Sequence, residues 1–235
     1  MKDKRLFVAV PVYQNLPVEF VMCWLKLVQD RDLPFKISGH FLQGESLISR
    51  ARNRLTADFL ATDCTHLLFI DCDLIFRVED VKRLAAHDEA IVGGFVPIKR
   101  DGELLFAAYP LPDSPPPDER GLIPLRYIGG FLLVRRDVFE KMLAVYGHEI
   151  AYRCDRTGRV EHDFWRVGIY RPRREHPGRY LSEDWYFLQC ALDLGFKVYG
   201  DTRVILKHIG TIPYPATSDT MQWDGKLAKF ISKGK

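Results

Sequence analysis

Two aspartates in the first half of the chain stand where acidic side chains can hold a cation. Asp71 and Asp73 directly follow His66–Ile70, an apolar run with the length of a strand. Alternate residues of an extended segment point the same way, so both carboxylates can approach one divalent ion. Mg²⁺ and Mn²⁺ prefer oxygen ligands and commonly bridge to phosphates. The alternative is that these acids merely solvate a loop, as we expect for a second Asp-x-Asp at Asp30 and Asp32.

Basic and amide side chains precede this pair on a predicted helix, Ser46–Ala61. Arg50 and Arg52 are two cations on this helix, and Asn53 is the amide beside them. An ordinary helix-surface cation is one interpretation of Arg52, and a ligand-binding cation is the other. Only the position of this helix relative to the sheet decides between the two.

A second acidic pair, Glu183 and Asp184, begins another predicted helix, Ser182–Leu194. Ser182 is a good N-cap, and acids in the first turn complement the helix dipole, so this turn is favourable even without a catalytic role. The pair is also suited to general base chemistry, and both interpretations stay open at this point.

The elements that must position these residues alternate along the first hundred residues. Strand patterns alternate with helix patterns, which predicts an α/β fold with a mostly parallel central sheet flanked by helices. Acids that follow a strand then lie at the carboxyl edge, where such sheets bind ligands. The predicted strands are Arg5–Tyr13, Phe35–Leu42, His66–Ile70 and Ala90–Pro97, and the predicted helices are Pro17–Asp30, Ser46–Ala61 and Glu79–Ala86.

The second half of the chain reads as less regular. Lys99–Pro124 contains five prolines between Pro110 and Pro117 and predicts a surface excursion. Ile128–Val134 predicts one strand and Arg136–Val145 a helix. We expect one domain over residues 1–235, with an irregular region in its second half.

Composition places the chain among ordinary globular proteins, with 47% hydrophobic and 28% charged residues. No apolar run approaches the roughly 18 residues of a membrane span. The five cysteines are scattered without metal-ligand spacing, which predicts a reducing, cytoplasmic setting rather than a disulfide framework.

Charge is unevenly distributed along the chain. The stretch from Arg153 to Arg179 holds eight arginines and four acids, so it carries +4 while the rest of the chain carries −1. Aromatic residues such as Phe164 and Tyr170 are interleaved with these arginines, a composition that suits an anionic polymer such as nucleic acid. The alternative is a solvated loop with local ion pairs.

The order of these motifs resembles the family-2-type glycosyltransferases of the GT-A fold, especially short single-domain members common in phages and bacteria. The resemblance spans roughly residues 5–100 and 125–210. Each motif alone is weak, and the assembled order carries the similarity. The matching segments are Val8–Tyr13, Ser49–Asn53, Asp71–Asp73, Ile128–Phe131, Arg135–Phe139, Ser182–Trp185 and His208–Gly210.

The resemblance implies a metal-dependent hexosyl transfer from a nucleotide diphosphate sugar, expected to be a UDP-sugar, to an acceptor hydroxyl. Asp71, Asp73 and His208 would bind Mn²⁺ or Mg²⁺, which would neutralise charge on the leaving diphosphate. Asp184 would be the general base, with Glu183 orienting donor or acceptor. Direct displacement would invert the anomeric centre, and a retaining course stays open.

The same resemblance divides the chain into a nucleotide-sugar-binding half, residues 1–100, and an acceptor-side half, residues 101–235. The acceptor would be a glycan or an anionic polymer such as hydroxymethylated phage DNA, bound by Arg171, Arg173 and Arg174. Gly129-Gly130 would let a sugar approach the backbone, or is a simple strand kink. The implied donor-binding residues are Pro11, Tyr13, Arg50, Arg52, Asn53, Asp71, Gly129, Gly130 and Trp185. Among them, Arg50 or Arg52 could contact the diphosphate or the nucleoside, and Asn53 could brace a loop.

Two rival functions remain. A nucleotidyltransferase would place a glycine-rich phosphate loop after the first strand, whereas Pro11–Asn15 contains no glycine. A non-catalytic module that binds nucleic acid or glycan is the other rival, and the intact acidic motifs argue against it.

Overall fold

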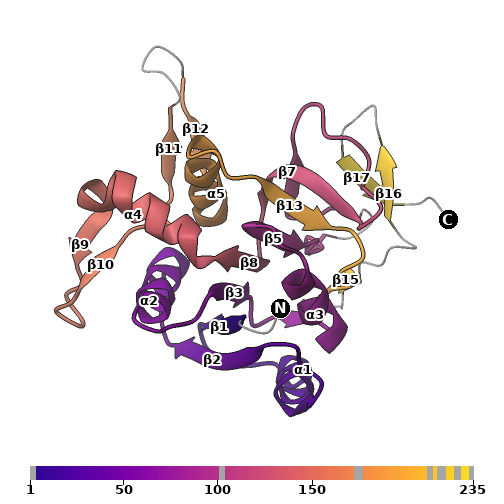
Figure 1. Cartoon of the computed structure of the whole chain (residues 1–235), viewed down its shortest axis with the longest axis horizontal. Helices are drawn as coiled ribbons and strands as arrows, with labels where there is room; N and C mark the ends of the chain where they lie inside the picture. Colours follow the sequence, from indigo (N-terminus) through magenta and orange to yellow (C-terminus); the bar gives the residue numbers. More distant parts are fainter. Residues whose placement is uncertain are drawn as a thin grey trace.

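A central eight-stranded sheet organises the protein, in the strand order β2-β1-β3-β8-β5-β13-β7-β6 (Figure 1). The computed structural model describes residues 4–100, 104–171, 177–210, 214–215, 221–224 and 229–232. The strands of this sheet are β1 (Arg5–Val12), β2 (Lys36–Gln43), β3 (His66–Ile70), β5 (Ile91–Gly94), β6 (Ala108–Pro110), β7 (Leu122–Ile128), β8 (Phe131–Arg135) and β13 (Val198–Asp201). The helices are α1 (Val18–Gln29), α2 (Ile48–Leu60), α3 (Val78–Ala86), α4 (Arg136–Ile150) and α5 (Glu183–Asp193).

The α/β fold class is confirmed, but the sheet is mixed rather than mostly parallel. Strand β1 pairs in parallel with β2 and β3, and β13 pairs in parallel with β5. Strand β8 lies between β3 and β5 and is antiparallel to both, and β7 is antiparallel to β13. The parallel half is therefore the half in which strand and helix patterns alternate in the sequence.

The predicted strand Ile128–Val134 is confirmed as β8 from Phe131 onward, but its start is wrong, because two strands meet there. Strand β7 ends at Ile128 and β8 begins at Phe131, with Gly129 and Gly130 forming the turn. Gly130 has a φ of 83°, a left-handed conformation that favours glycine. An uninterrupted apolar pattern runs across this turn, so hydrophobicity alone does not reveal the break.

Helices cover both faces of the sheet, which explains why the strands read as continuous apolar runs. Helices α1 and α3 pack on one face of β1, against Leu6 and Val8, while α2, α4 and α5 share the other core with Phe7 and Ala9. Figure 1 shows α1 and α3 together and α2 and α4 on the other side.

The arginine-rich stretch was expected to be irregular, but short hairpins form within it. Strands β9 (Ala151–Arg153) and β10 (Val160–His162) pair antiparallel, as do β11 (Gly168–Tyr170) and β12 (Arg179–Leu181). The remaining short strands are β4 (Leu74–Ile75), β14 (Lys207–His208), β15 (Tyr214–Pro215), β16 (Met221–Asp224) and β17 (Lys229–Ser232).

Among the described residues, no helix is both long and apolar enough to cross a membrane.

Phe139 on α4 joins three helices, so its truncation tests the packing. Its ring is fully buried and lies 5.3–5.6 Å from the rings of Phe59, Phe164 and Phe187. We expect Phe139→Ala to lower the free energy of unfolding by about 3–5 kcal/mol, measured by urea denaturation. Val145→Ala on the same helix is the control, since Val145 is 51% exposed and its truncation should cost little. Equal losses in the two variants would contradict this packing.

Candidate functional site

The acidic site begins where β3 ends. Asp71 follows the last residue of this buried strand, and its backbone N–H donates to the Gly130 carbonyl at the start of β8. This bond fixes Asp71 at the carboxyl edge of the sheet beside the Gly129-Gly130 turn. The position agrees with the expectation from sequence, and the contact with Gly130 comes from the antiparallel pairing of β3 and β8.

Arg52 on α2 lies beneath three carboxylates. Its side chain is 2% exposed, and its Nη2 donates to Asp71 Oδ1 at 3.0 Å. The same guanidinium lies 3.6 Å from Glu183 Oε1 and 3.4 Å from Asp184 Oδ1, at the start of α5. One helix from each half of the chain thus contributes to a single cluster, which we call the Arg52 cluster: Arg52, Asp71, Glu183 and Asp184.

Two aromatic rings pack against the Arg52 guanidinium on its side away from water. The Phe69 ring centroid is 5.0 Å from Arg52 Cζ, and the Trp165 centroid is 5.6 Å away. Cation–π contact stabilises a cation in such desolvated surroundings. Arg52 is therefore not an ordinary helix-surface cation.

The Arg52 cluster contains three carboxyl groups and only one cation, and this imbalance shifts the pKa values of its members. Burial is the main cause that raises the pKa of Asp184, to about 7, and repulsion from Glu183 and Asp71 adds to it. Burial also raises the pKa of Asp71, against the attraction of Arg52. Burial alone would lower the pKa of Arg52, but the three carboxylates outweigh it and raise that pKa. Arg52 therefore stays charged while the cluster readily takes up a proton.

Polar atoms in the cluster are left without hydrogen-bond partners. Within the part of the chain that the structure describes, these buried atoms are Arg52 Nε, Arg52 Nη1 and Asp184 Oδ1. Buried polar groups are usually satisfied, and leaving one unpaired costs about 1–3 kcal/mol. Arg52 Nε and Asp184 Oδ1 instead take part in ion pairs, at 3.6 Å from Glu183 Oε1 and at 3.4 Å from Arg52 Nη2.

Asp73 lies in a second group with His208 and Lys99. Its Oδ2 is 3.0 Å from His208 Nε2 and 2.5 Å from Lys99 Nζ. Burial would raise the pKa of Asp73, but the hydrogen bonds from His208 and Lys99 outweigh it and lower that pKa to about 2. Asp73 is therefore a carboxylate at every physiological pH, unlike Asp184.

His208 is oriented by the backbone of the strand end beside it. Its Nδ1 lies 2.7 Å from the Pro97 carbonyl, which can only accept, so Nδ1 carries the proton. Its Nε2 lies 3.0 Å from Asp73 Oδ2 and donates to that carboxylate when it carries a proton. An imidazole held in this way is the usual arrangement for a metal-binding histidine.

The acidic and histidine side chains of the site fit a divalent cation only in part. Among the described residues, no three His, Cys, Asp or Glu side chains are grouped as ligands for one ion, because Asp71 turns to Arg52. Asp73 Oδ2 and His208 Nε2 do face each other, at 3.0 Å. Mg²⁺ is commonly held by one or two protein ligands together with substrate phosphates, so a two-residue site is chemically sufficient.

The two glycines of the β7–β8 turn make room for the acids. A Cβ on Gly129 would collide with Asp184 Oδ2, and one on Gly130 would lie 3.2 Å from Asp71 Oδ2. The turn therefore brings the backbone against carboxylates of both acidic motifs. This role differs from the two that the sequence left open, which were contact with a sugar and a simple strand kink.

Other residues predicted to bind a donor lie around the cluster, not within it. Asn53 is buried and braces a loop as expected, donating to Asp163 Oδ1 at 2.7 Å. Arg50 pairs with Glu45, and Trp185 stacks on Tyr127 with ring centroids 4.7 Å apart. Pro11 and Tyr13 lie at the end of β1, where Pro11 is buried and Tyr13 is 60% exposed.

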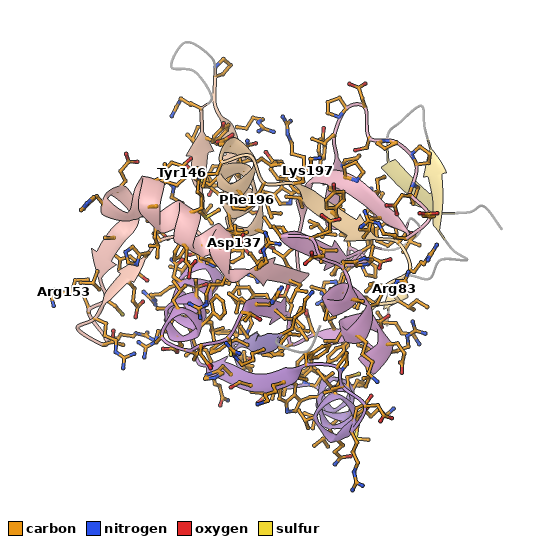
Figure 2. The ribbon with its side chains drawn as sticks, in the orientation of Figure 1. Arg83, Asp137, Tyr146, Arg153, Phe196 and Lys197 are labelled. Atoms are coloured by element: carbon orange, nitrogen blue, oxygen red, sulfur yellow. The ribbon has the colours of Figure 1, made fainter. Side chains whose placement is uncertain are left out.

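Several arginines of the basic stretch make local contacts. Arg156 pairs with Glu45, and Arg159 lies 3.6 Å from Asp58. Figure 2 shows Arg153 at the outer end of the β9–β10 hairpin. For these arginines the local-contact alternative applies. Arg171 is exposed, whereas Arg173 and Arg174 lie outside the described residues.

Two residues of the site were missed by the sequence reasoning. Lys99 follows β5 inside a segment that was assigned to a surface excursion, and nothing in its neighbourhood marks it as a partner of Asp73. Trp165 carries no motif, yet it covers Arg52 and stacks on Phe187, with ring centroids 4.1 Å apart. Only the tertiary contacts identify either residue.

Comparison with known proteins shows a shared fold but no family. No family model and no curated protein matches the chain. A solved structure described as A197 from STIV matches with a TM-score of 0.54 and 16% identity, covering 99% of this chain and 95% of that one. At this identity the likeness shows the fold alone, an α/β structure consistent with a Rossmann-like GT-A fold. The family-2 resemblance stays a prediction.

A second solved structure is similar over a smaller part of the chain. It is assigned as a glucose-1-phosphate thymidylyltransferase from Bacillus anthracis, in complex with sucrose. Its TM-score is 0.29 and its identity 12%, with 61% of this chain and 75% of that one covered. A TM-score this low supports no conclusion about the present chain.

Replacing Asp184 should change how stability depends on pH. Its folded-state pKa is raised from 3.8 to about 7, so the folded protein binds this proton more tightly than the unfolded chain. The stability from this group is present below about pH 4 and is lost as the pH rises to about 7. We expect Asp184→Asn to gain stability relative to wild type, by on the order of 1 kcal/mol or more, between about pH 4 and pH 8.

Urea unfolding of both proteins across this pH range measures the difference. Asp63→Asn is the matched control, because the Asp63 side chain is 84% exposed and its replacement should leave the pH profile unchanged. A constant difference between Asp184→Asn and wild type from acid to neutral pH would contradict the raised pKa.

Proposed function

We propose that the protein is a metal-dependent glycosyltransferase that moves a sugar from a nucleotide diphosphate sugar to an acceptor hydroxyl. The single observation that supports this most is the convergence of both acidic motifs. Asp71 and Asp184 share the Arg52 guanidinium at the carboxyl edge of the sheet, although they lie 19 and 132 residues away from Arg52 in the chain. The pKa of Asp184 is raised to about 7, whereas the pKa of Asp73, two residues after Asp71, is lowered to about 2. Carboxyl groups whose pKa values are pushed apart are typical of acid–base sites.

Asp184 is the residue suited to act as general base. A carboxyl group whose pKa lies near 7 is partly deprotonated at neutral pH. In that form it can readily accept a proton from the acceptor. In the proposed reaction the acceptor O–H gives its proton to Asp184, and the acceptor oxygen forms a bond to the anomeric carbon. The bond from that carbon to the diphosphate oxygen breaks, and the diphosphate leaves with the bond electrons. Displacement in one step inverts the anomeric centre.

Arg52 positions the acids in this scheme. It is too buried to reach a donor, but it holds Asp71 and faces both Glu183 and Asp184. Its charge keeps the pKa of Asp184 from rising further, so the base is not permanently protonated. Glu183 lies beside Asp184 and would orient the donor or the acceptor.

Asp73 and His208 would hold the divalent cation, Mn²⁺ or Mg²⁺, with Asp71 nearby. When bound, the cation would neutralise the charge that develops on the leaving diphosphate. Lys99 binds Asp73 Oδ2 and is a second cation placed to face the same phosphates.

The charge of Asp73 should be essential for donor binding with metal. We expect Asp73→Asn to abolish stabilisation by nucleotide sugars in the presence of Mn²⁺, because a dication needs the charge that the amide lacks. A thermal-shift panel of nucleotide sugars with and without Mn²⁺ measures this. Asp32→Asn, in the other Asp-x-Asp, should behave as wild type. Metal-dependent stabilisation of folded Asp73→Asn would refute the proposed metal role.

Removal of the base should affect turnover more than donor binding. We expect Asp184→Asn to lower turnover by roughly 10²-fold or more, with donor affinity nearly unchanged. Turnover is measured as nucleoside diphosphate release with the donor that the thermal-shift panel identifies. If the variant loses donor affinity as strongly as turnover, Asp184 belongs to the donor pocket instead.

A further inference from the structure

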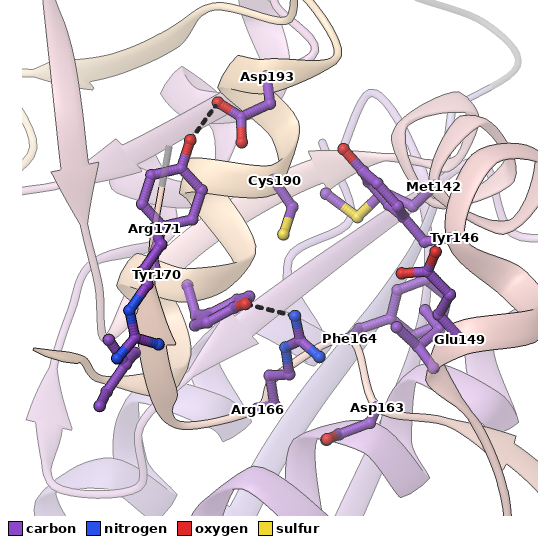
Figure 3. Close-up of a pocket in the computed structure, with 13 residues that line it drawn as sticks. Met142, Tyr146, Glu149, Asp163, Phe164, Arg166, Tyr170, Arg171, Cys190 and Asp193 are labelled. Carbon is purple, nitrogen blue, oxygen red and sulfur yellow. Dashed lines mark hydrogen bonds between the residues drawn. The ribbon is translucent and has the colours of Figure 1, made fainter. Parts of the chain in front are cut away.

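A cavity of about 310 Å³ lies between α4, α5 and the β11–β12 hairpin, apart from the Arg52 cluster. Figure 3 shows Met142 and Tyr146 of α4 facing Cys190 of α5 across this space. Tyr170 and Arg171 enter from the hairpin. The cavity lies within the range of volumes that small-molecule sites occupy.

Aromatic and apolar side chains form most of its wall. Phe164 and Tyr186 are almost fully buried there, and Ile169 is 49% exposed at the opening. A flat ring could pack between such groups, since base–aromatic stacking is worth about 1–3 kcal/mol per base. The wall therefore suits an aromatic ligand.

Two arginines, Arg166 and Arg171, line the cavity together with three acids. Arg166 donates to the Tyr186 hydroxyl and lies over its ring, with Cζ 4.4 Å from the centroid. Within the described ranges, neither Arg166 nor Arg171 forms an ion pair with a carboxylate, in contrast to Arg156 and Arg159. Both remain able to donate to an anion.

Two of the three acids that line the cavity are already hydrogen-bonded. Asp193 accepts from the Tyr170 hydroxyl and from Gln189, and Asp163 accepts from Asn53. Glu149 is the third acid and is exposed on α4. The acids thus position neighbouring side chains, whereas the arginines keep donors for a ligand.

The cavity is separated from the Arg52 cluster by packed rings. Phe164 and Arg166 line the cavity, but Trp165 between them stacks on Phe187 and covers Arg52. Trp165 and Phe187 are both fully buried. A ligand in the cavity would therefore occupy a site distinct from the acidic edge of the sheet.

A second cavity, of about 430 Å³, extends this site toward the start of α2. It shares Asp163 and Arg166 with the first cavity and adds Ser49 and Arg50. Arg50 in this second cavity is already paired with Glu45.

We propose that the cavity between α4, α5 and the β11–β12 hairpin binds a nucleotide, an aromatic base with its phosphate. The base packs against Phe164 and Tyr186, and the phosphate faces Arg166 and Arg171. The nucleotide is either free or one residue of a single-stranded nucleic acid. This inference does not depend on glycosyl transfer, because it uses no residue of the Arg52 cluster and no metal.

Cys190 provides a direct test in the unaltered protein. Its thiol lines the cavity, and burial raises its pKa to about 11, so it should react slowly with iodoacetamide at alkaline pH. We expect dTMP or an oligothymidylate, added in EDTA, to slow alkylation of Cys190 at least several-fold. Mass spectrometry of the Cys190 peptide gives the rate, with the Cys72 peptide as internal reference.

The choice of added ligand distinguishes a free nucleotide from a single-stranded nucleic acid. Protection by dTMP alone at low concentration identifies a free nucleotide, while protection by the oligonucleotide only identifies single-stranded nucleic acid. Glucose 6-phosphate has the charge but no ring, so it should not protect. Equal protection by glucose 6-phosphate, or no protection by either nucleotide ligand, would overturn the proposal.

Matched arginine variants give an independent measurement. We expect Arg166→Ala with Arg171→Ala to weaken oligothymidylate binding about tenfold or more at low salt. The slope of log affinity against log salt should fall by about 0.7 for each lost phosphate contact. Arg156→Ala with Arg159→Ala removes the same charge from the same stretch, outside the cavity, and should change affinity less than threefold. Equal effects of the two pairs would exclude a specific role for the cavity.

Discussion

The guanidinium of Arg52 lies in the protein interior under three carboxylates, and much of the site depends on this contact. A buried charge is tolerated only when it is paired, and Arg52 is paired by acids that come from β3 and from α5. Phe69 and Trp165 exclude water from its other side. The contact thereby ties α2, β3 and α5 to one another, and it also sets the protonation of Asp184.

The mixed sheet makes this contact possible. Antiparallel insertion of β8 between β3 and β5 places the Gly129-Gly130 turn directly beside the end of β3. The absence of side chains in the turn lets Asp184 and Asp71 approach the backbone from two sides. A parallel strand in the same place would put its turn at the opposite edge. The acids of two distant motifs would then have no common neighbour.

The arginine-rich stretch divides into two kinds of residue once its contacts are known. Arg156 and Arg159 stabilise the β9–β10 hairpin against α2 through Glu45 and Asp58. Arg166 instead packs on Tyr186 at the wall of a cavity. Net charge over the stretch is thus a poor measure of its affinity for anions, because the ion pairs that neutralise it are formed with residues far away in sequence.

The sequence by itself determined the α/β class, the parallel half of the sheet and the position of Asp71 at a strand end. These are local properties, since helical and strand periodicity and a polar residue after an apolar run need no distant partner. The structure alone decided the antiparallel course of β8, the burial of Arg52 and the contact of Asp73 with Lys99. Each depends on residues such as Lys99, Trp165 and His208 that come into contact only when the chain folds, and desolvation, the main cause of the raised pKa of Asp184, exists only after folding.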